Sequence, residues 1–270
     1  MIDVDTTELS QRVEQYPAEV PAGVIVLTCG VDVQDDRLEY EVVGWGRGSE
    51  SWGIQAGVLW GDPEQPDVWA ELDVLLGRQW LKEDGIALAI RRTAIDAMGH
   101  KTDSVYRYCK PRMKLGVFAI QGKGGPGHPL VGKPKANNRY GAQLFPLGVD
   151  GAKTTLMGRV DATMALNPET DRIAGPGICH WPSDPARGYN AEWFAQLMAE
   201  EKKYKGTKGH QVPYWQPIRK RNEALDCRIY ATAALVILSP TLAILSEPVT
   251  IIGNRSRTPR KRRTRRMVRR

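Results

Sequence analysis

The sequence has few cysteines, and none of them is spaced to bind a metal. The four cysteines of the 270-residue chain are widely separated, and no CxxC pair occurs. This scatter excludes a zinc knuckle and is typical of a reduced, intracellular protein. No basic-then-apolar leader stands at the amino end, and the apolar run 231–245 is interrupted by Pro240 and too short to cross a bilayer. The sequence therefore predicts a soluble protein of the cytoplasm that does not contact a membrane.

An excess of positive charge is also lacking over most of the chain. The formal net charge is +7, yet residues 255–270 hold ten Lys and Arg and no acid, which leaves 28 basic and 31 acidic residues elsewhere. Such a run is typically solvated and binds polyanions without sequence preference. We therefore expect residues 241–270 to form a C-terminal extension with a disordered polybasic tail. The DNA contacts predicted in this tail are Arg260, Lys261, Arg262 and Arg263.

A nucleotide-binding loop is the third absence. The sequence GxxxxGK[ST], in which backbone amides and a lysine hold the phosphates of ATP, occurs nowhere in the 270 residues. These residues therefore do not contain an ATPase motor of that type.

What the chain does contain is an alternation of β-prone and helical segments. Three β-prone segments, 24–33, 37–46 and 49–60, are joined by short turns, which predicts an antiparallel meander. After them the pattern predicts a helix over 67–82, a strand over 87–96, a helix over 102–108 and a strand over 117–121. A strand–helix–strand passage implies parallel pairing. The predicted fold class is therefore α/β, a mixed sheet of antiparallel meander plus parallel strands, flanked by helices.

The second half of the chain predicts longer loops between fewer elements. Residues 122–148 are rich in Gly, Pro and Lys and have no apolar period, as a functional or disordered loop would. The further predictions are a helix over 152–160, a strand over 178–181, a helix over 191–202, a basic loop over 203–221 and a buried last helix over 223–238. We place the domain at 23–240 and interpret residues 1–22 as a linker or the remnant of an upstream domain.

Three aspartates are placed where a site could form. Asp32 lies near the end of the first predicted strand, on the same face as Gly30, and Asp96 ends the fourth strand. If these strands are parallel neighbours, both acids lie at the carboxyl edge of the sheet, where α/β folds place their sites. Asp226 lies on an apolar stripe of the last helix, where a carboxylate is costly unless a cation compensates it. Glu223 shares that face and is a predicted additional metal ligand.

The chemistry of these side chains points to a hard metal ion. Carboxylate oxygens suit Mg²⁺ or Mn²⁺ and do not suit Zn²⁺. A pair of such ions can activate water and stabilise the leaving oxygen in phosphodiester hydrolysis. The alternative interpretation is that each acid is a strand-end cap, a helix cap or a surface charge, and spacing alone leaves both open. In the 122–148 loop, predicted contacts to a DNA backbone are Lys123, Lys133, Lys135 and Arg139, the alternative being a solvated loop.

Longer stretches of the sequence resemble a known family. Residues 20–46, VPAGVIVLTCGVDVQDDRLEYEVVGWG, and 221–235, RNEALDCRIYATAAL, resemble the nuclease domain of lambda-type phage terminase large subunits. Residues 93–110, TAIDAMGHKTDSVYRYCK, are similar to the family's second acidic strand and the helix after it. The resemblance implies a ribonuclease-H-like fold and a metal-dependent endonuclease that cuts concatemeric viral DNA into genome lengths for packaging. The family's acidic positions correspond to Asp32, Asp96 and Asp226.

The resemblance also implies partners and raises one departure. It implies double-stranded DNA as substrate, a pair of Mg²⁺ or Mn²⁺ ions, and a terminase small subunit, a portal protein and a separate ATPase motor as partners in the host cytoplasm. Packaging large subunits carry that motor before the nuclease, so we expect this chain to be a nuclease fragment, a split gene or a prophage remnant. Two alternatives remain open: a non-catalytic DNA-binding or assembly module on the same fold, and a ribonuclease-H-type nuclease acting on hybrids or branched DNA.

Overall fold

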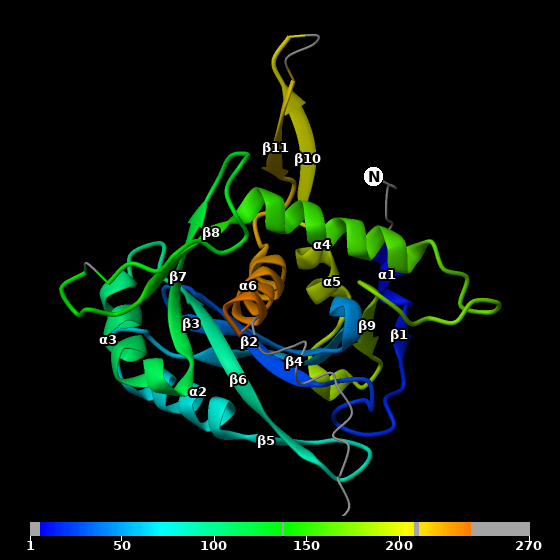
Figure 1. The fold of residues 1–270 in the computed structure, drawn as a ribbon, viewed down its shortest axis with the longest axis horizontal. Helices are drawn as coiled ribbons and strands as arrows, with labels where there is room; N and C mark the ends of the chain where they lie inside the picture. The colour runs from blue at the N-terminus through cyan, green and yellow to red at the C-terminus, as the bar shows by residue number, and fades with distance from the viewer. Residues whose placement is uncertain (1–5, 137, 208–210, 239–270) are drawn as a thin grey trace, which may run out of the picture.

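The computed structural model describes residues 6–136, 138–207 and 211–238, and a mixed sheet forms its centre (Figure 1). The strands of this sheet are β1 (Val13–Glu14), β2 (Val26–Val33), β3 (Arg37–Trp45), β4 (Ser51–Trp60), β5 (Gln79–Leu81), β6 (Ala87–Asp96), β7 (Val117–Lys123), β8 (Leu144–Gly148) and β9 (Cys179–Pro182). The helices are α1 (Thr6–Ser10), α2 (Asp67–Gly77), α3 (Thr102–Arg112), α4 (Val149–Met164), α5 (Ala191–Leu197) and α6 (Glu223–Leu238). A separate hairpin consists of β10 (Glu200–Lys205) and β11 (Val212–Pro217).

The sheet combines the antiparallel and parallel halves that the sequence predicts. Its nine strands run in the order β1-β9-β4-β3-β2-β6-β7-β8, with β5 paired to β6. Strands β2, β3 and β4 form the expected antiparallel meander. Strands β2, β6, β7 and β8 are parallel. The predicted parallel neighbours at the centre are therefore confirmed, and β2 and β6 end at the same edge.

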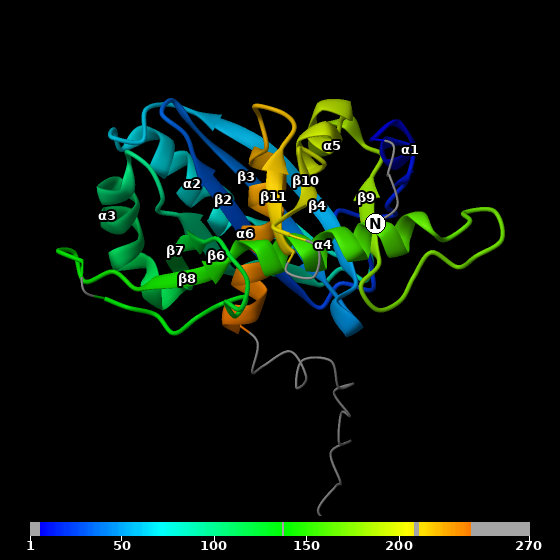
Figure 2. The same cartoon turned by 90° about the horizontal axis from the view of Figure 1, so that it is seen from above.

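Helices cover both faces of the sheet, as the view from above shows (Figure 2). The side chains of β2 alternate between the two layers, as strand geometry requires. Leu27, Cys29 and Val31 belong to the core that includes residues of α2 and α3. The opposite face of β2 packs against α6, and α4 and α5 contribute to the core on that side. The last helix is buried along most of its length, as its apolar sequence predicts.

The described part of the segment before residue 23, residues 6–22, is packed against the rest of the molecule. Strand β1 pairs in parallel with β9 at the edge of the sheet. The side chains of Leu9 and Val20 are fully buried. The interpretation of residues 1–22 as a linker did not anticipate this packing, because the apolar residues of the segment are few and widely spaced.

Two predicted helices have different bounds. The helix predicted over 67–82 ends at Gly77, and the residues that follow form β5. Trp80, fully buried in the centre of β5, pairs with Leu88 of β6. Strand pairing and the burial of this large ring therefore outweigh the helical period. Helix α3 extends past the predicted end at Tyr108 and contains Pro111 in its last turn.

The loops of the second half contain more structure than predicted. The helix predicted over 191–202 ends at Leu197, and the basic loop that follows it is largely the β10–β11 hairpin. The hairpin projects beyond α4 at the top of Figure 1. The Gly-rich segment 122–148 includes all of β8, and α4 begins immediately after it at Val149. None of the described helices is long and apolar enough to cross a membrane.

Candidate active site at the carboxyl edge of β2 and β6

A glycine in β2 allows α6 to pack directly on the sheet. A Cβ atom added at Gly30 would lie 2.0 Å from the carbonyl oxygen of Cys227 and 2.5 Å from the backbone nitrogen of Ala231. Two residues earlier, the hydroxyl of Thr28 donates a 2.8 Å hydrogen bond to the carbonyl oxygen of Ala231. Backbone-to-backbone approach of this kind is possible only without a side chain. It brings the first turns of α6 next to the end of β2.

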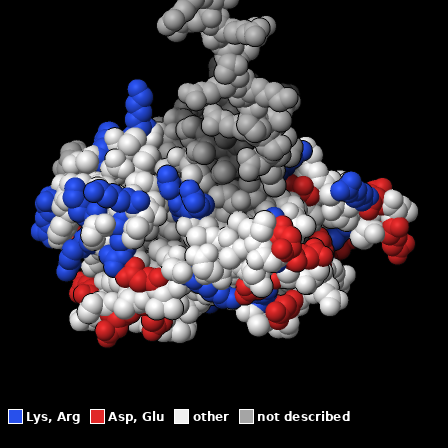
Figure 3. All heavy atoms as spheres, turned by 60° about the horizontal axis from the view of Figure 1, so that its bottom comes forward, with Lys and Arg blue, Asp and Glu red and all other residues white. Residues whose placement is uncertain are grey.

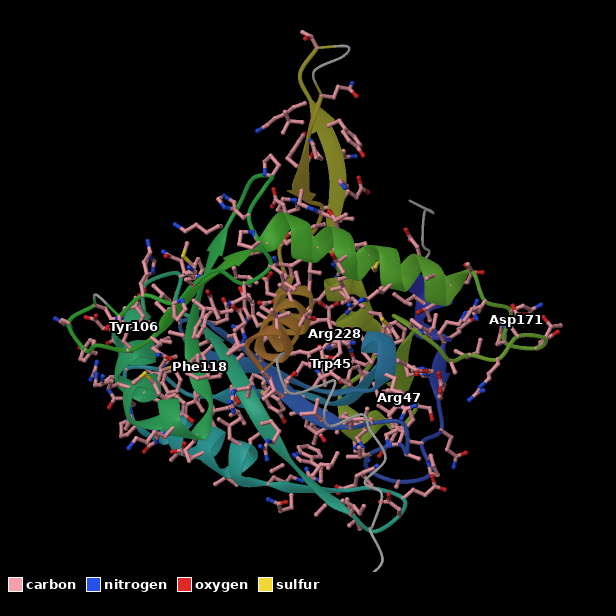
Figure 4. The ribbon with its side chains drawn as sticks, viewed as in Figure 1. Trp45, Arg47, Tyr106, Phe118, Asp171 and Arg228 are labelled. Carbon is pink, nitrogen blue, oxygen red and sulfur yellow. The ribbon has the colours of Figure 1, made fainter. Side chains whose placement is uncertain are left out.

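A buried ion pair fixes the same helix to the neighbouring strand β3. The guanidinium of Arg228 donates to both carboxylate oxygens of Glu41 on β3, at 2.6 Å and 2.9 Å. Both side chains are within 1% of complete burial. The hydroxyl of Tyr189 donates a third hydrogen bond to Glu41. Figure 4 shows Arg228 at the centre of the molecule, on the part of α6 that follows the candidate site.

Two of the predicted site residues end adjacent strands. Val31 of β2 is the register partner of Ile95 of β6, so Asp32 and Asp96 follow a paired position on the two strands. Their side chains are only 5% and 7% exposed. The structure therefore brings these two carboxylates to one edge, as the parallel arrangement predicted.

The third aspartate reaches this edge from above the sheet. Asp226 lies in the first turn of α6 and is half-buried. It is close enough to Asp32 and Asp96 for their charges to raise its pKa. Burial is the main cause that raises the pKa of Asp226, to about 8, and the nearby charges of Asp32, Glu200 and Asp96 raise it further. The three aspartates of the sequence prediction therefore form one electrostatic cluster built by β2, β6 and α6.

The other two aspartates also hold protons more tightly than usual. Burial, followed by the charge of Asp32, raises the pKa of Asp96 to about 7. Burial and the charges of Glu223 and Glu39 raise the pKa of Asp32 to about 6. Like charges at close range disfavour joint ionisation unless a cation compensates them. The cluster thus has a deficit of positive charge.

Amide side chains hold two of the carboxylates. The Nδ2 atom of Asn222 donates to Oδ2 of Asp226 at 3.1 Å, and Nε2 of Gln34 donates to Oδ2 of Asp32. The Oδ1 atom of Asp96 accepts a bond from the backbone nitrogen of Met98 at 3.2 Å. Within the described residues, no three His, Cys, Asp or Glu side chains are grouped so closely that they could already hold a metal ion.

Glu223 is compensated by arginines. Its carboxylate accepts from Arg37 at 2.8 Å and from Arg221 at 3.3 Å. The same two arginines also pair with Glu39, so two glutamates and two arginines alternate in one network. The structure therefore places Glu223 beside the cluster with two arginine partners, and its role as an additional metal ligand stays a prediction.

Three further polar residues lie next to the cluster, and sequence reasoning did not select them as site residues. Nζ of Lys153 on α4 contacts both oxygens of Glu200 at 2.7 Å, and both residues are buried. Asn222 bridges Glu200 and Asp226, with 3.1 Å to each. Lys153 lowers the pKa of Asp226 and so opposes the effect of its acidic neighbours on that pKa. The four-residue spacing of Asn222 and Asp226 was a readable signal, whereas Glu200 was hidden in a predicted helix.

The predicted DNA contacts are spread over one side of the molecule. Lys123 is exposed at the carboxyl end of β7, three residues after Ile120, which pairs with Asp96. Lys135 bridges to Leu144 at the far end of β8, and Arg139 pairs with Asp103 of α3. Lys133 is exposed and precedes Lys135 by two residues. Figure 3 shows Lys and Arg gathered toward the left, the side on which Figure 1 places α3. The predicted contacts Arg260, Lys261, Arg262 and Arg263 lie outside the described residues.

Known proteins share both the sequence and the fold. The family model of the terminase large subunit gpA, endonuclease domain, matches residues 2–244. The terminase large subunit of Escherichia phage lambda is 34% identical over 251 residues, which cover 90% of this chain and 38% of that protein. The corresponding subunit of Enterobacteria phage P21 is 33% identical over 232 residues, covering 86% and 35%. The chain thus spans little more than a third of these relatives.

Solved structures give an independent comparison of the fold. A mutant nuclease domain of the large terminase subunit gp2 of bacterial virus Sf6, with manganese, has a TM-score of 0.51 and 12% identity, over 85% of this chain and 97% of that one. The same domain with manganese and beta-thujaplicinol has a TM-score of 0.50 and 12% identity, over 87% and 98%. At this identity the likeness concerns the fold alone.

These comparisons settle the fold class and the family. The likeness to terminase nuclease domains confirms the predicted ribonuclease-H-like mixed α/β sheet flanked by helices. The resemblance carried by the GVDVQDDRLE and RNEALDC segments is confirmed by the family match and by both relatives. The chain belongs to the family of the terminase large subunit gpA endonuclease domain.

Proposed function

We propose that this domain is a metal-dependent DNA endonuclease whose reaction takes place at the edge formed by Asp32, Asp96 and Asp226. The observation that carries the proposal is the convergence of these three carboxylates from β2, β6 and α6. Burial and the charges of nearby carboxylates raise all three pKa values, so the cluster needs a cation to be fully ionised near neutral pH. A scaffold without catalytic function would have no need of such a costly arrangement.

The donor set fits Mg²⁺ or Mn²⁺. All three side chains offer hard carboxylate oxygens, and the cluster contains no thiolate or imidazole. A pair of ions bound there would activate water and neutralise the leaving oxygen of a phosphodiester. As placed, the three side chains are not yet grouped as ligands. We infer that their carboxylates turn toward one another when cations replace their repulsion by attraction.

The neighbouring residues prepare the cluster for that change. Asn222 and Gln34 each occupy one oxygen of an aspartate and leave the second oxygen for ligation. Lys153 favours the ionised form of Asp226, and Glu200 holds the lysine in place through two short hydrogen bonds. These residues thus orient the carboxylates and set their charge, and they do not themselves need to touch the scissile phosphate.

The substrate follows from the relatives. Two terminase large subunits, of phages lambda and P21, are more than 30% identical to this chain over most of its length. We propose that the domain cuts concatemeric double-stranded viral DNA in the host cytoplasm. A terminase small subunit, a portal protein and an ATPase motor would be its partners there. The motor would be needed because DNA translocation requires nucleotide hydrolysis, and this sequence contains no GxxxxGK[ST] loop.

A comparison of substrates tests the proposal. The purified protein is incubated with supercoiled plasmid, with an RNA–DNA hybrid and with a branched DNA, each with Mg²⁺, Mn²⁺ or a chelator. We expect nicking and linearisation of the plasmid that require the metal, and slower cleavage of the other substrates. Preferential cleavage of the hybrid or the branch would instead identify a ribonuclease-H-type nuclease. Binding of DNA without cleavage under all conditions would identify a non-catalytic module.

A further inference from the structure

A narrow groove lies between the Gly-rich segment and the projecting hairpin. Its volume is about 260 Å³. The residues at its walls are Gly125 to His128 from the segment after β7, Asp150, Gly151 and Thr154 from the start of α4, and Lys202, Pro213 and Trp215 from the hairpin. Its size is close to the lower end of small-molecule sites, about 300 Å³. The groove can therefore admit a group the size of one nucleotide base.

The walls of the groove are held in place by specific contacts. The backbone nitrogen of Gly125 donates to a carboxylate oxygen of Asp150 at 2.9 Å, which ties the Gly-rich segment to α4. On the opposite wall, the indole nitrogen of Trp215 donates to the backbone oxygen of Asp150 at 3.2 Å. The ring is half-buried, so part of its surface is open. These hydrogen bonds therefore hold the walls of the groove in place, and one of the walls is aromatic.

Positive charge lies on the same wall. Lys202 is the register partner of Trp215, so both side chains lie on one face of the hairpin. Its Nζ atom is 3.3 Å from the hydroxyl of Thr154 and has no carboxylate partner among the described ion pairs. The exposed His128 stands on the other wall. An aromatic surface next to a lysine without a carboxylate partner is a combination with which proteins bind a single nucleic-acid strand.

The walls of the groove adjoin residues that border the carboxylate cluster. On β10, Glu200 faces Lys153, and two residues further Lys202 faces Thr154, the next residue of α4. On the other wall, the Gly-rich segment leaves β7, whose Ile120 pairs with Asp96. A strand with its backbone at the cluster would therefore pass next to the groove.

We propose that this groove binds one unstacked nucleotide of the DNA strand adjacent to the scissile phosphate, with its base against Trp215 and its phosphate near Lys202. The inference rests on the proposed function, because it places DNA at the cluster. The occupant is an unstacked base, because in an intact duplex neighbouring pairs cover both faces of every base and leave none for an indole ring. Duplex DNA that enters the site would therefore be locally opened at this position.

The test measures binding with the 270-residue chain in chelator, so that it does not depend on cleavage. The probes are a fluorescently labelled single-stranded oligonucleotide and the blunt duplex of the same sequence. Salt is kept at or above about 0.15 M to weaken non-specific attraction by the polybasic residues 255–270. We expect Trp215→Leu to raise the Kd for the single strand on the order of tenfold and to change the Kd for the duplex far less.

Matched variants separate the groove from general effects. Trp215→Phe keeps an aromatic face and should bind the single strand nearly as well as the wild type. Lys202→Gln should weaken single-strand binding. Lys203→Ala should not, because Lys203 lies on the opposite face of the hairpin and pairs with Glu201. Melting curves of all variants show whether the hairpin is still folded.

The outcomes decide the proposal without reference to nuclease activity. Equal weakening of both probes by Trp215→Leu, or no weakening of either, would overturn it. If Trp215→Leu lowers the melting temperature, the comparison of Lys202→Gln with Lys203→Ala decides the proposal instead. Equal effects of these two lysine variants on the Kd for the single strand would overturn it. A protein that binds as expected but never cuts would instead contradict the proposed function and leave the groove assignment standing.

Discussion

Gly30 of β2 lies against the backbone of Cys227 in α6 so closely that a Cβ at Gly30 would stand 2.0 Å from its carbonyl oxygen. Asp32 follows Gly30 by two residues on the same face of β2, and Asp226 immediately precedes Cys227. One close contact between strand and helix therefore sets the separation of two site carboxylates.

The first prediction concerns this contact. Gly30→Ala should lower the free energy of unfolding by about 1–3 kcal/mol, because backbone atoms cannot move aside as flexible side chains do. It should also lower the nuclease rate by more than its stability loss explains, since α6 must shift away from β2. The control is Gly158→Ala on the exposed side of α4, where an added Cβ meets nothing within 4 Å and helix propensity favours alanine. Equal, small effects of the two changes would contradict this account.

The second prediction concerns pH and stability without metal. The pKa of Asp226 in the folded protein is about 8, against about 3.9 in an unfolded chain. Between these values the folded state keeps a proton that the unfolded state has released, so the free energy of unfolding falls as pH rises. Asp226→Asn removes this dependence. The melting temperature of the variant minus that of the wild type, measured in chelator, should be small near pH 4 and should increase up to about pH 8. A constant difference across this range would show that folding does not raise the pKa of Asp226.

The third prediction concerns Asn222. Its amide holds one oxygen of Asp226 and one of Glu200. Asn222→Ala should raise the Mn²⁺ concentration needed for half-maximal cleavage by about 10–100-fold, a typical effect of removing a residue that orients a metal ligand. The fold should survive, and excess metal should restore part of the rate. Asn138→Ala in the segment before β8 serves as the control. An unchanged metal requirement in Asn222→Ala would show that Asp226 needs no such support.

The fourth prediction concerns the buried pair of Arg228 and Glu41. Arg228→Met leaves the carboxylate of Glu41 without its cation in a site with no exposure, and should cost about 3–5 kcal/mol of stability. Adding Glu41→Gln to this variant removes the unpaired charge and keeps an acceptor for Tyr189, so stability should partly return. Urea unfolding of the two single variants and the double variant measures the coupling. Additive losses would contradict a direct interaction.

The sequence allowed the central part of the fold to be predicted because local patterns there agree with the tertiary structure. Strands β2, β3 and β4 combine β-prone residues with short turns, and the apolar surface of α6 matches its burial. The two strand-end aspartates could be placed because parallel neighbours end at one edge. The elements that were predicted wrongly depend on contacts between residues that are far apart in the sequence. Trp80 is held by pairing with β6, which no local period of the sequence reveals.

The site was less predictable for the same reason. Glu200 and Lys153 are 47 residues apart, and only the folded chain shows that they form a buried pair. Glu223 shares the first turn of α6 with Asp226, yet its arginine partner Arg37 comes from β3. Spacing along a helix gives the direction of a side chain, but its partners depend on which strands pack against it.

The most direct measurement is the nicking rate of supercoiled plasmid in Mn²⁺ by aspartate-to-asparagine variants. Each of Asp32→Asn, Asp96→Asn and Asp226→Asn should lower the rate by orders of magnitude while the protein stays folded and still binds DNA. The double variant of Asp32 and Asp226 should be little worse than either single change, because residues that act as a unit lose their function together. Asp171→Asn is the control, since Figure 4 places this exposed residue on a loop far from α6. If Asp226→Asn nicks the plasmid at the wild-type rate, the three carboxylates are not the nuclease site.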